Sequence, residues 1–446
     1  MTDPIYFSYS NLYKHSKFQC KISPNNHYVA NAIENRLVIR AHGQDLTVVQ
    51  VNETRQPIDY LLWSPTSDYI LTTNFEKSRI DVRSVIDPKW HGVITDERYP
   101  FIKIKWSPDS KNILCISELK LRLAIWNLST KEMKFINHIK YSEKGIEFSP
   151  DGKYVAIVEK YNGKDCIGIY QGNSFILLHR FEVDTVNLDN IKWSPDSLYI
   201  AVWDNCLYHK LLVYRQDGFL CTIYKGYEFG LGIKCVNWSP NGELLALGNF
   251  DQTIHLLSTL SWKLIGILQH PTVLTETMET IALEEIEVPQ SGMPSFQKFN
   301  IDYRHILSRP FNIPTRKTAY EEINPRIGIG LCQFSPDGLY LFSKSDIMPN
   351  VIWIWQIKSL KCLHIILFRK TIKQVCWNPS RKHLLTIISG DEHVHFIQPL
   401  IENDGIDISP QKIPMTDFLV KKMKWDSNGN SLLLMDHELF CLAVQK

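Results

Sequence analysis

The chain has 446 residues and a formal net charge of +2, which excludes a strong overall field that would attract nucleic acid or a membrane surface. Its composition, 44% hydrophobic and 22% charged, is that of a soluble globular protein. The ten cysteines form no C-x-x-C pair and mostly lie in apolar runs, so we expect reduced core residues. Because no run is apolar enough for a membrane span and no secretory leader is recognisable, we expect a soluble, intracellular protein.

A turn motif recurs along the chain as an aromatic residue, serine and proline followed by two small or polar residues. Its clearest copy, residues 334–338, reads Phe-Ser-Pro-Asp-Gly, where proline presets φ at the second position of a type I turn and glycine closes it. Short apolar runs on both sides predict a β-hairpin. The structural turn residues are Pro65, Pro108, Pro150, Pro195, Pro240, Pro336, Asp337 and Gly338, with further copies at Pro24 and Pro379 and a degenerate one at 425–429.

The spacing of these turns predicts the architecture. Most successive prolines lie 41 to 45 residues apart, which is the period of four-stranded propeller blades. In the unit around Pro108, the alternation of 102–106 predicts a first strand, and the runs 113–116, 123–126 and 133–136 complete a set of four. No stretch within a unit has a convincing helical period. The sequence therefore predicts an all-β propeller.

The two ends of the chain indicate how the propeller closes. The last unit supplies only three strands, near 420–425, 432–435 and 439–444, and a spare strand near 5–10 precedes the first unit. If the spare strand completes the last blade, no sheet edge is left free. We therefore predict one β-propeller over residues 1–446, a closed ring of nine blades. The alternatives are eight blades with an outer hairpin, two rings, or a tenth degenerate blade in the long gap described next.

One interval breaks the period, because 96 residues separate Pro240 from Pro336. The excess forms an insertion at 270–324, with an acidic first half and a basic second half. A segment of this length is either a solvated loop or a functional arm, for example a partner-docking arm or a strap. We predict that removing residues 272–322 leaves a folded ring and weakens partner binding.

Signatures of catalysis are missing from the sequence. It contains no nucleophile elbow, phosphate-binding loop, zinc-protease helix or kinase motif, so we predict no enzyme activity, catalytic residue or cofactor. His393 and His395 alternate on one predicted strand, but no cysteine pair completes a tetrahedral set, so we predict no metal. The glycine pairs at 230–232 and 328–330 precede strands rather than helices, and we interpret them as backbone hinges.

Two loops in consecutive units carry more aromatic and charged residues than a turn requires. They contribute Trp203, Asp204 and Tyr208, and then Tyr227, Glu228 and Phe229. Aromatic side chains in loops are frequent contact residues in interfaces, although burial against a neighbouring blade would explain them as well. We predict that these six residues form one partner-binding patch.

The units resemble WD repeats, with the hallmark Trp-Asp changed to Trp-Asn at 126–127 and to Trp-Gln at 355–356. The Gly-His dipeptide of such repeats is missing, which argues against a standard Asp-His-Ser tetrad. Three segments are similar to a more specific family, the centrosomal and spindle-pole WD-repeat family named for lying antisense to a tumour-protein gene. These segments are Asn324-Pro325-Arg326-Ile327-Gly328-Ile329-Gly330, continuing through Phe334-Ser335-Pro336-Asp337 to 349–355; Ala201-Val202-Trp203-Asp204-Asn205-Cys206-Leu207; and Leu231-Gly232-Ile233-Lys234 leading into Trp238-Ser239-Pro240.

This resemblance implies a non-enzymatic scaffold in the cytoplasm, at the cytoskeleton and specifically the centrosome or spindle pole body. The implied partner is a coiled-coil anchoring protein, with which the family tethers microtubule minus ends and supports spindle assembly. A minus-end-directed kinesin and the γ-tubulin machinery are further implied partners, and no membrane or specific nucleic acid is expected. The alternative is an RNA-binding or translation-initiation-type propeller, whose Trp-Ser-Pro turns are similar.

Overall fold

The computed structural model describes residues 6–96, 98–117, 122–289, 299–317, 326–381, 383–400 and 405–445. Every regular element among these residues is a β-strand, so the predicted all-β class is confirmed. This described part of the chain has no helix with the length and hydropathy of a membrane span. Residue 5 of the predicted N-terminal strand, residues 324–325 of the family segment, and residues 290–298 and 318–324 of the insertion lie outside the described residues.

Nine sheets of propeller-blade type follow one another along the chain, each built on antiparallel strands. Blades 1 to 3 are β3 (Cys20–Ile22), β4 (Tyr28–Ile33), β5 (Arg36–Ala41) and β6 (Val48–Glu53); β7 (Tyr60–Trp63), β8 (Tyr69–Asn74), β9 (Arg79–Ser84) and β10 (His91–Thr95); and β11 (Phe101–Trp106), β12 (Asn112–Ser117), β13 (Arg122–Asn127) and β14 (Met133–Ile136). Blades 4 to 6 are β15 (Ile146–Phe148), β16 (Tyr154–Tyr161), β17 (Lys164–Gln171) and β18 (Leu177–Glu182); β19 (Leu188–Trp193), β20 (Tyr199–Asp204), β21 (Lys210–Arg215) and β22 (Leu220–Lys225); and β23 (Ile233–Trp238), β24 (Leu244–Asn249), β25 (Thr253–Ser258) and β26 (Leu264–Gln269).

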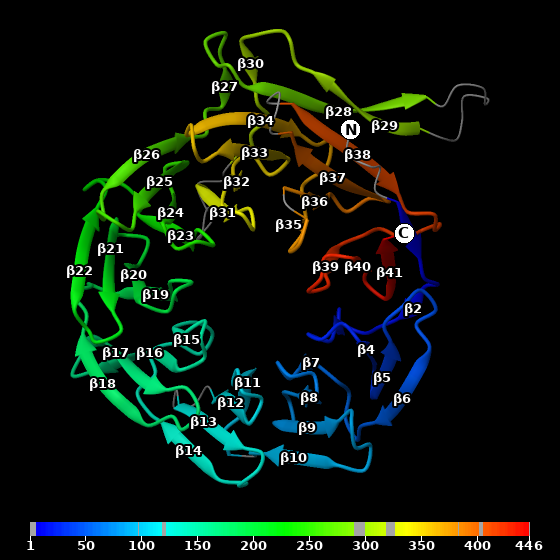
Figure 1. Ribbon diagram of the computed structural model, residues 1–446, viewed down its shortest axis with the longest axis vertical. Helices are drawn as coiled ribbons and strands as arrows, with labels where there is room; N and C mark the ends of the chain where they lie inside the picture. The colour runs from blue at the N-terminus through cyan, green and yellow to red at the C-terminus, as the bar shows by residue number, and fades with distance from the viewer. Residues whose placement is uncertain are drawn as a thin grey trace. The chain divides into compact units, whose positions relative to one another are not determined.

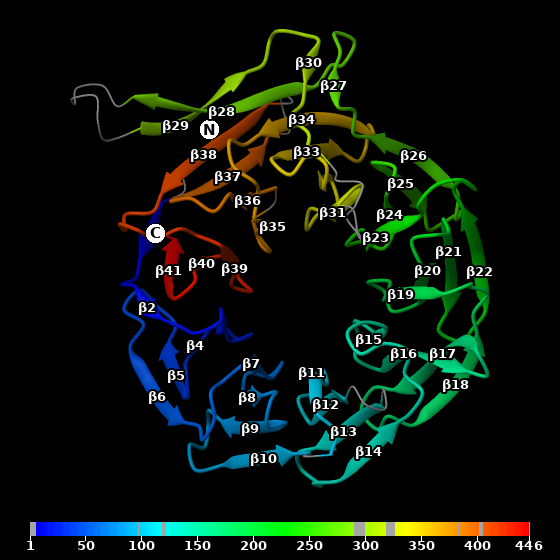
Figure 2. The ribbon, with the colours of Figure 1, turned by 180° about the vertical axis from the view of Figure 1, so that it is seen from behind.

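Blades 7 and 8 are β31 (Ile329–Phe334), β32 (Tyr340–Ser345), β33 (Val351–Gln356) and β34 (Lys361–Leu367); and β35 (Gln374–Trp377), β36 (Leu385–Ile388), β37 (His393–Pro399) and β38 (Ile406–Lys412). With the terminal blade 9, the count confirms the nine-bladed propeller that the sequence predicts. The chain divides into two compact units, residues 1–202, 213–221 and 422–446, and residues 203–212 and 222–421. In the first unit, β7, β11 and β15 lie on the inner side of an arc of blades, and β6, β10, β14 and β18 on its outer side (Figures 1 and 2).

Blade 9 joins the two ends of the chain within the first unit. It consists of β39 (Lys422–Trp425), β40 (Ser431–Met435), β41 (Leu439–Gln445) and β1 (Phe7–Tyr9), with β2 (Tyr13–Lys14) also paired to β41. Strand β1 runs antiparallel to β41, with Phe7 opposite Gln445 and Tyr9 opposite Ala443. The predicted completion of the last blade by the N-terminal strand is confirmed, and it covers an edge that would otherwise present unpaired backbone groups.

The serine of the repeated turn motif organises the turn itself. In blade 7 the Ser335 hydroxyl donates to Asp337 Oδ1 at 2.6 Å and accepts from the backbone N–H of Tyr340 at 3.0 Å. The N–H of Gly338 donates to the Ser335 carbonyl at 2.9 Å, and Gly338 has a φ of 76°, in the left-handed region that glycine tolerates. The motif therefore combines a turn hydrogen bond, a side-chain brace and a residue suited to positive φ.

Where the residue before the serine is tryptophan, its indole N–H can link neighbouring blades. The indole N–H of Trp63 in β7 donates at 3.0 Å to the Lys21 carbonyl in β3 of the preceding blade. In the second unit, Trp377 in β35 donates in the same way to the Gln333 carbonyl in β31 at 3.2 Å. These bonds join the first strands of neighbouring blades and satisfy a buried donor, as packed interiors require.

Over its described residues, 270–289 and 299–317, the insertion forms strands and is neither a solvated loop nor a tenth four-stranded blade. It contains β27 (Val273–Leu274) paired with β30 (Phe311–Asn312), and an antiparallel hairpin of β28 (Ile281–Pro289) and β29 (Phe299–His305). Strand β28 extends the sheet of blade 7 by parallel pairing with its outermost strand, β34. Figure 1 shows the β28–β29 hairpin on the outer side of β34. Its core residues are Leu274, Ala282, Ile306 and Ile313, which belong to one buried cluster with Trp353.

Candidate partner-binding site

The structure brings together the two loops that the sequence singles out, and both lie in the second unit. One loop connects β20 to β21, and the other connects β22 to β23. The N–H of Gly232 in the second loop donates to the Cys206 carbonyl in the first at 2.7 Å. A Cβ at Gly232 would lie 2.4 Å from the Tyr208 carbonyl oxygen, so only glycine permits this approach.

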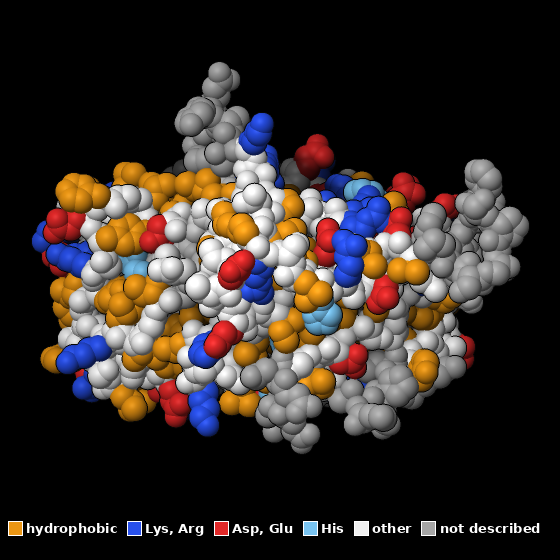
Figure 3. Space-filling view, turned by 90° about the horizontal axis from the view of Figure 1, so that it is seen from above, with side chains coloured by type: hydrophobic (Ala, Val, Ile, Leu, Met, Phe, Trp, Pro, Cys, Tyr) orange, Lys and Arg blue, Asp and Glu red, His pale blue; other side chains and the backbone are white. Residues whose placement is uncertain are grey.

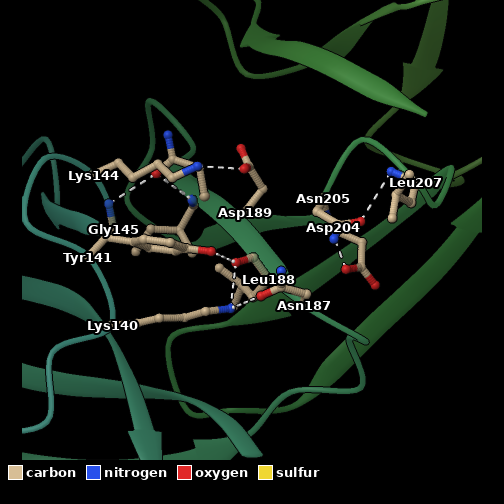
Figure 4. A network of polar contacts seen from close by, with 12 residues as sticks. Lys140, Tyr141, Lys144, Gly145, Asn187, Leu188, Asp189, Asp204, Asn205 and Leu207 are labelled. Carbon is tan, nitrogen blue, oxygen red and sulfur yellow. Dashed lines mark hydrogen bonds and ion pairs between the residues drawn. The ribbon is translucent and has the colours of Figure 1, made fainter. Parts of the chain in front are cut away.

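Two of the six predicted contact residues do not reach the surface. Trp203 is buried and the Asp204 side chain is fully buried at the end of β20. Asp204 Oδ1 accepts the N–H of Asn205 at 3.0 Å, and Asn205 Oδ1 accepts the N–H of Leu207 at 3.1 Å (Figure 4). The prediction is corrected for this pair, because Trp203 and Asp204 support the loop from beneath.

His209, which the sequence reasoning missed, is the centre of the platform under the second loop. Its ring lies 4.4 Å from the Tyr227 ring, and its Nδ1 accepts the N–H of Gly226 at 3.1 Å. Because Nδ1 accepts, Nε2 carries the proton and donates to Asn249 Oδ1 at 3.1 Å. Burial lowers the pKa of His209, which keeps the ring neutral. The only signal in the sequence is its place directly before a strand.

Tyr227 belongs to the platform more than to the surface. Its hydroxyl donates to the Leu231 carbonyl, and burial raises the pKa of this phenol. His255 Nδ1 lies 3.0 Å from the Tyr224 hydroxyl, to which it is hydrogen-bonded. Burial lowers the pKa of His255 to about 4. Two neutral histidines and two tyrosines thus hold the second loop in a fixed position.

The exposed part of the patch is apolar at its centre. Phe229 is 92% exposed, Leu207 63% and Tyr208 44%, and Glu228 is exposed beside them. Phe229 also borders a cavity of about 300 Å³ that is lined by Tyr227, Leu231, Phe250 and Ile327. We call the exposed residues Leu207, Tyr208, Glu228 and Phe229 the 207–229 surface. Exposed apolar side chains around a cavity are typical of a surface that binds a partner.

A buried polar triad of Trp355, Ser343 and His270 lies in the second unit, and a backbone carbonyl takes the place that an aspartate has in the standard tetrad. The Trp355 indole N–H donates to the Ser343 hydroxyl at 2.8 Å, and Ser343 Oγ lies 2.6 Å from His270 Nε2. His270 Nδ1 donates to the Gln252 carbonyl at 2.9 Å, so Nε2 accepts the serine proton. Burial lowers the pKa of His270 to about 3. Sequence reasoning missed the histidine because no glycine precedes it.

A second polar network joins blades 4 and 5 in the first unit (Figure 4). Lys140 Nζ donates to Asp165 Oδ2 at 2.9 Å and to the Leu188 carbonyl at 2.8 Å. The Tyr141 hydroxyl donates to the same carbonyl at 2.6 Å. The side chains of Lys140 and Asp165 are only 7% and 4% exposed, so this ion pair is part of the packing between blades and not of a binding surface.

The surface charge agrees with the small formal net charge. On the face seen in Figure 3, basic and acidic side chains are interspersed with hydrophobic ones and no single sign dominates. An interaction site on such a surface depends on shape and apolar contacts more than on long-range steering.

Comparison with known proteins agrees with the blade pattern. A sequence profile of the family described as WD domain, G-beta repeat matches residues 218–257, which run from before β22 into β25. Among solved structures, the C-terminal WD40 domain of Sif2 is similar with a TM-score of 0.51 and 11% identity, covering 98% of both chains. The chain is therefore a WD-repeat β-propeller, a class that generally acts as non-catalytic scaffolding.

More specific similarity extends over nearly the whole chain. WD repeat-containing protein WRAP73 of Mus musculus is 32% identical, over 98% of this chain and 95% of that protein. An uncharacterised WD repeat-containing protein of Schizosaccharomyces pombe is 28% identical, over 74% of this chain and 67% of that protein. The chain belongs to the WRAP73 family of WD-repeat proteins, and this membership indicates a protein-interaction scaffold.

Proposed function

We propose that this protein is a non-enzymatic scaffold at the centrosome or spindle pole body. There it binds a coiled-coil anchoring partner, helps to tether microtubule minus ends and supports spindle assembly. A minus-end-directed kinesin and the γ-tubulin machinery are the further partners of this proposal. The observation that carries it is the family membership over 98% of the chain, together with the centrosomal role that the resemblance implies.

The 207–229 surface is the proposed contact for the coiled-coil partner. Phe229, Leu207 and Tyr208 supply apolar anchors, and the cavity beside Phe229 can receive one side chain of a docked helix. Glu228 and Asp251 at its border favour a helix with basic residues next to its apolar positions. The hydrogen bonds beneath the loops fix these anchors before binding, which reduces the entropy that binding costs.

The test compares two substitutions at equally exposed apolar residues of the second unit. Phe229→Asp changes the proposed contact, and Leu260→Asp, at a residue 91% exposed in the turn before β26, is the matched control. Each tagged variant is imaged through mitosis and used to recover bound proteins. We expect the wild type and Leu260→Asp to concentrate at spindle poles with the coiled-coil partner. With Phe229→Asp, the amount of partner recovered should fall at least about tenfold, as it does when a central aromatic residue of an interface is replaced.

Two outcomes would contradict the proposal at different levels. A diffuse wild-type signal with no enrichment at spindle poles would refute the scaffold role, and ribosome co-sedimentation that survives moderate salt would favour the translation-type alternative. Normal localisation and partner recovery in Phe229→Asp would keep the role but remove the 207–229 surface from it.

A further inference from the structure

Three buried side chains from distant parts of the second unit converge where the insertion meets blade 8. Glu285 lies on β28, Asp391 precedes β37, and His395 lies within β37. Their possible ligand atoms, one from each residue, lie within 4.8 Å of one another, and all three residues are buried. We propose that Glu285, Asp391 and His395 form a binding site for a divalent transition-metal ion of the zinc type, which fastens the β28–β29 hairpin to blade 8.

His395 provides an observation independent of the two carboxylates. Its side chain is fully buried, and among the described residues its Nε2 has no hydrogen-bond partner. Its Nδ1 lies 2.7 Å from the Tyr303 hydroxyl, which comes from β29 of the same hairpin. If Nδ1 donates to this hydroxyl, Nε2 holds a lone pair in the interior. An imidazole whose other nitrogen is fixed by a hydrogen bond is the usual arrangement of a metal ligand.

The two carboxylates are held in place by their own contacts. Asp391 accepts the Ser389 hydroxyl at 2.9 Å through one oxygen and the His393 N–H at 2.9 Å through the other. Glu285 Oε2 accepts the backbone N–H of Arg369 at 2.9 Å. These neutral donors orient the oxygens and add no positive charge of their own, so two carboxylates lie close together in the interior. A cation between them would relieve this repulsion.

The donor set selects the kind of ion. One imidazole nitrogen with two carboxylate oxygens suits Zn²⁺ and neighbouring transition ions, whereas Ca²⁺ and Mg²⁺ prefer oxygen ligands alone. In a tetrahedral site with bonds of about 2.1 Å the ligand atoms lie about 3.4 Å apart, so small side-chain rotations would close the set. Water can supply the fourth ligand, and His393, whose ring centroid lies 6.4 Å from that of His395, is not required.

A route for the ion is present beside the cluster. A cavity of about 180 Å³ adjoins it and is lined by Glu285 and Asp391 together with Glu287, Glu392, Arg369 and Lys370. Arg369 is paired with Glu287 and Lys412 with Glu392, which leaves the carboxylates of Glu285 and Asp391 against Lys370 alone. The lining therefore attracts a cation, and the cluster is the place where a nitrogen ligand is added.

The test uses the full chain, stripped with a chelator and titrated with Zn²⁺ alone by calorimetry and with Co²⁺ by visible absorption. We expect one Zn²⁺ per chain, a higher unfolding midpoint, and slower amide exchange in 281–289 and 299–305. Glu285→Gln, Asp391→Asn and His395→Gln should each weaken Zn²⁺ binding at least about tenfold, and Tyr303→Phe should weaken it less, because it only orients the ligand. Glu284→Gln, a neighbouring glutamate on β28 that pairs with Arg304 and does not line the cavity, is the matched control and should bind as the wild type does.

Absence of stoichiometric Zn²⁺ binding by the stripped full chain would overturn the proposal. Equal binding by the wild type and the three ligand variants would also overturn it and would mean an adventitious ion only. Ca²⁺ binding without Co²⁺ absorption would reject the nitrogen ligand and hence the site as assigned. If His395→Gln fails to fold, the near-isosteric Glu285→Gln and Asp391→Asn decide the result, since they leave β37 intact. None of these results depends on localisation or on the coiled-coil partner.

Discussion

Replacing Ser343 by alanine tests whether the buried triad stabilises the second unit. The side chain is fully buried, and its hydroxyl is the partner of both the Trp355 N–H and His270 Nε2. Alanine keeps the backbone and nearly the volume but leaves one donor and one acceptor unpaired. Each unpaired buried group costs about 1–3 kcal/mol, so we expect Ser343→Ala to lower the free energy of unfolding by about 2–6 kcal/mol.

The control is Ser359→Ala in the same blade. Ser359 donates to Gln356 Oε1 at 2.6 Å on the exposed surface, so its loss should change the free energy of unfolding by less than about 0.5 kcal/mol. Trp355→Phe adds a second arm, because it removes the donor that Ser343→Ala leaves unpaired. The double variant should therefore be more stable than the sum of the single effects predicts, by about 0.5–3 kcal/mol.

The measurement is urea denaturation followed by far-UV circular dichroism, with the slope compared between variants so that midpoints can be converted to free energies. A loss below about 0.5 kcal/mol for Ser343→Ala at an unchanged slope would refute the reasoning, since both orphaned groups must cost more than that in a dry interior. Strict additivity in the double variant would show that Trp355 and Ser343 do not interact.

Two further predictions concern His270 and the glycines of the second unit. The pKa of His270 is about 3 in the folded chain and about 6.5 when unfolded, so the unfolded state binds more protons between these two pH values. The free energy of unfolding, measured by urea titration, should therefore fall by about 2 kcal/mol from pH 7 to pH 5. His270→Gln should lose this pH dependence, and a variant that keeps it would show that another group is responsible. Gly338→Ala has open space, with Pro240 at 3.8 Å, and should cost about 1–2 kcal/mol from its positive φ alone. Gly328→Ala also brings Cβ to 2.5 Å from the Phe250 Cα, so this variant should have a lower thermal unfolding midpoint than Gly338→Ala. Equal midpoints for the two variants would contradict the steric argument.

The blades could be predicted because their signals are local. The turn at 334–338 contains its own brace and its own positive-φ glycine, and each copy repeats within a fixed period. The closing strand could be predicted because three strands at one end and a spare one at the other permit a single simple pairing. The tryptophan bonds between blades could not, since nothing in the motif says where the indole N–H points.

The candidate site was predictable only in outline. Both loops could be identified from their aromatic and charged residues, but alternation at the end of β20 does not say which side chains face inward, and Trp203 and Asp204 are buried. His209 supports the surface through partners on the following loop and on blade 6, at Gly226 and Asn249. Such long-range partners leave no pattern in the sequence around the histidine.

The insertion shows how an unusual strand can escape sequence reasoning. In β28 two adjacent glutamates break the alternation, and Glu285, one of them, is buried. The parallel partner of β28 is β34, about 80 residues further on, and no local signal predicts that pairing. Leu274, Ala282 and Ile306 belong to the buried core cluster of blade 7. In place of the folded ring predicted from the sequence, we therefore expect that deleting residues 272–322 exposes this core and destabilises the fold. The acidic character that suggested a solvated loop instead includes a buried carboxylate, which is costly in the interior unless a hydrogen bond or a cation compensates it. The Arg369 N–H supplies the hydrogen bond, and the proposed metal would supply the cation.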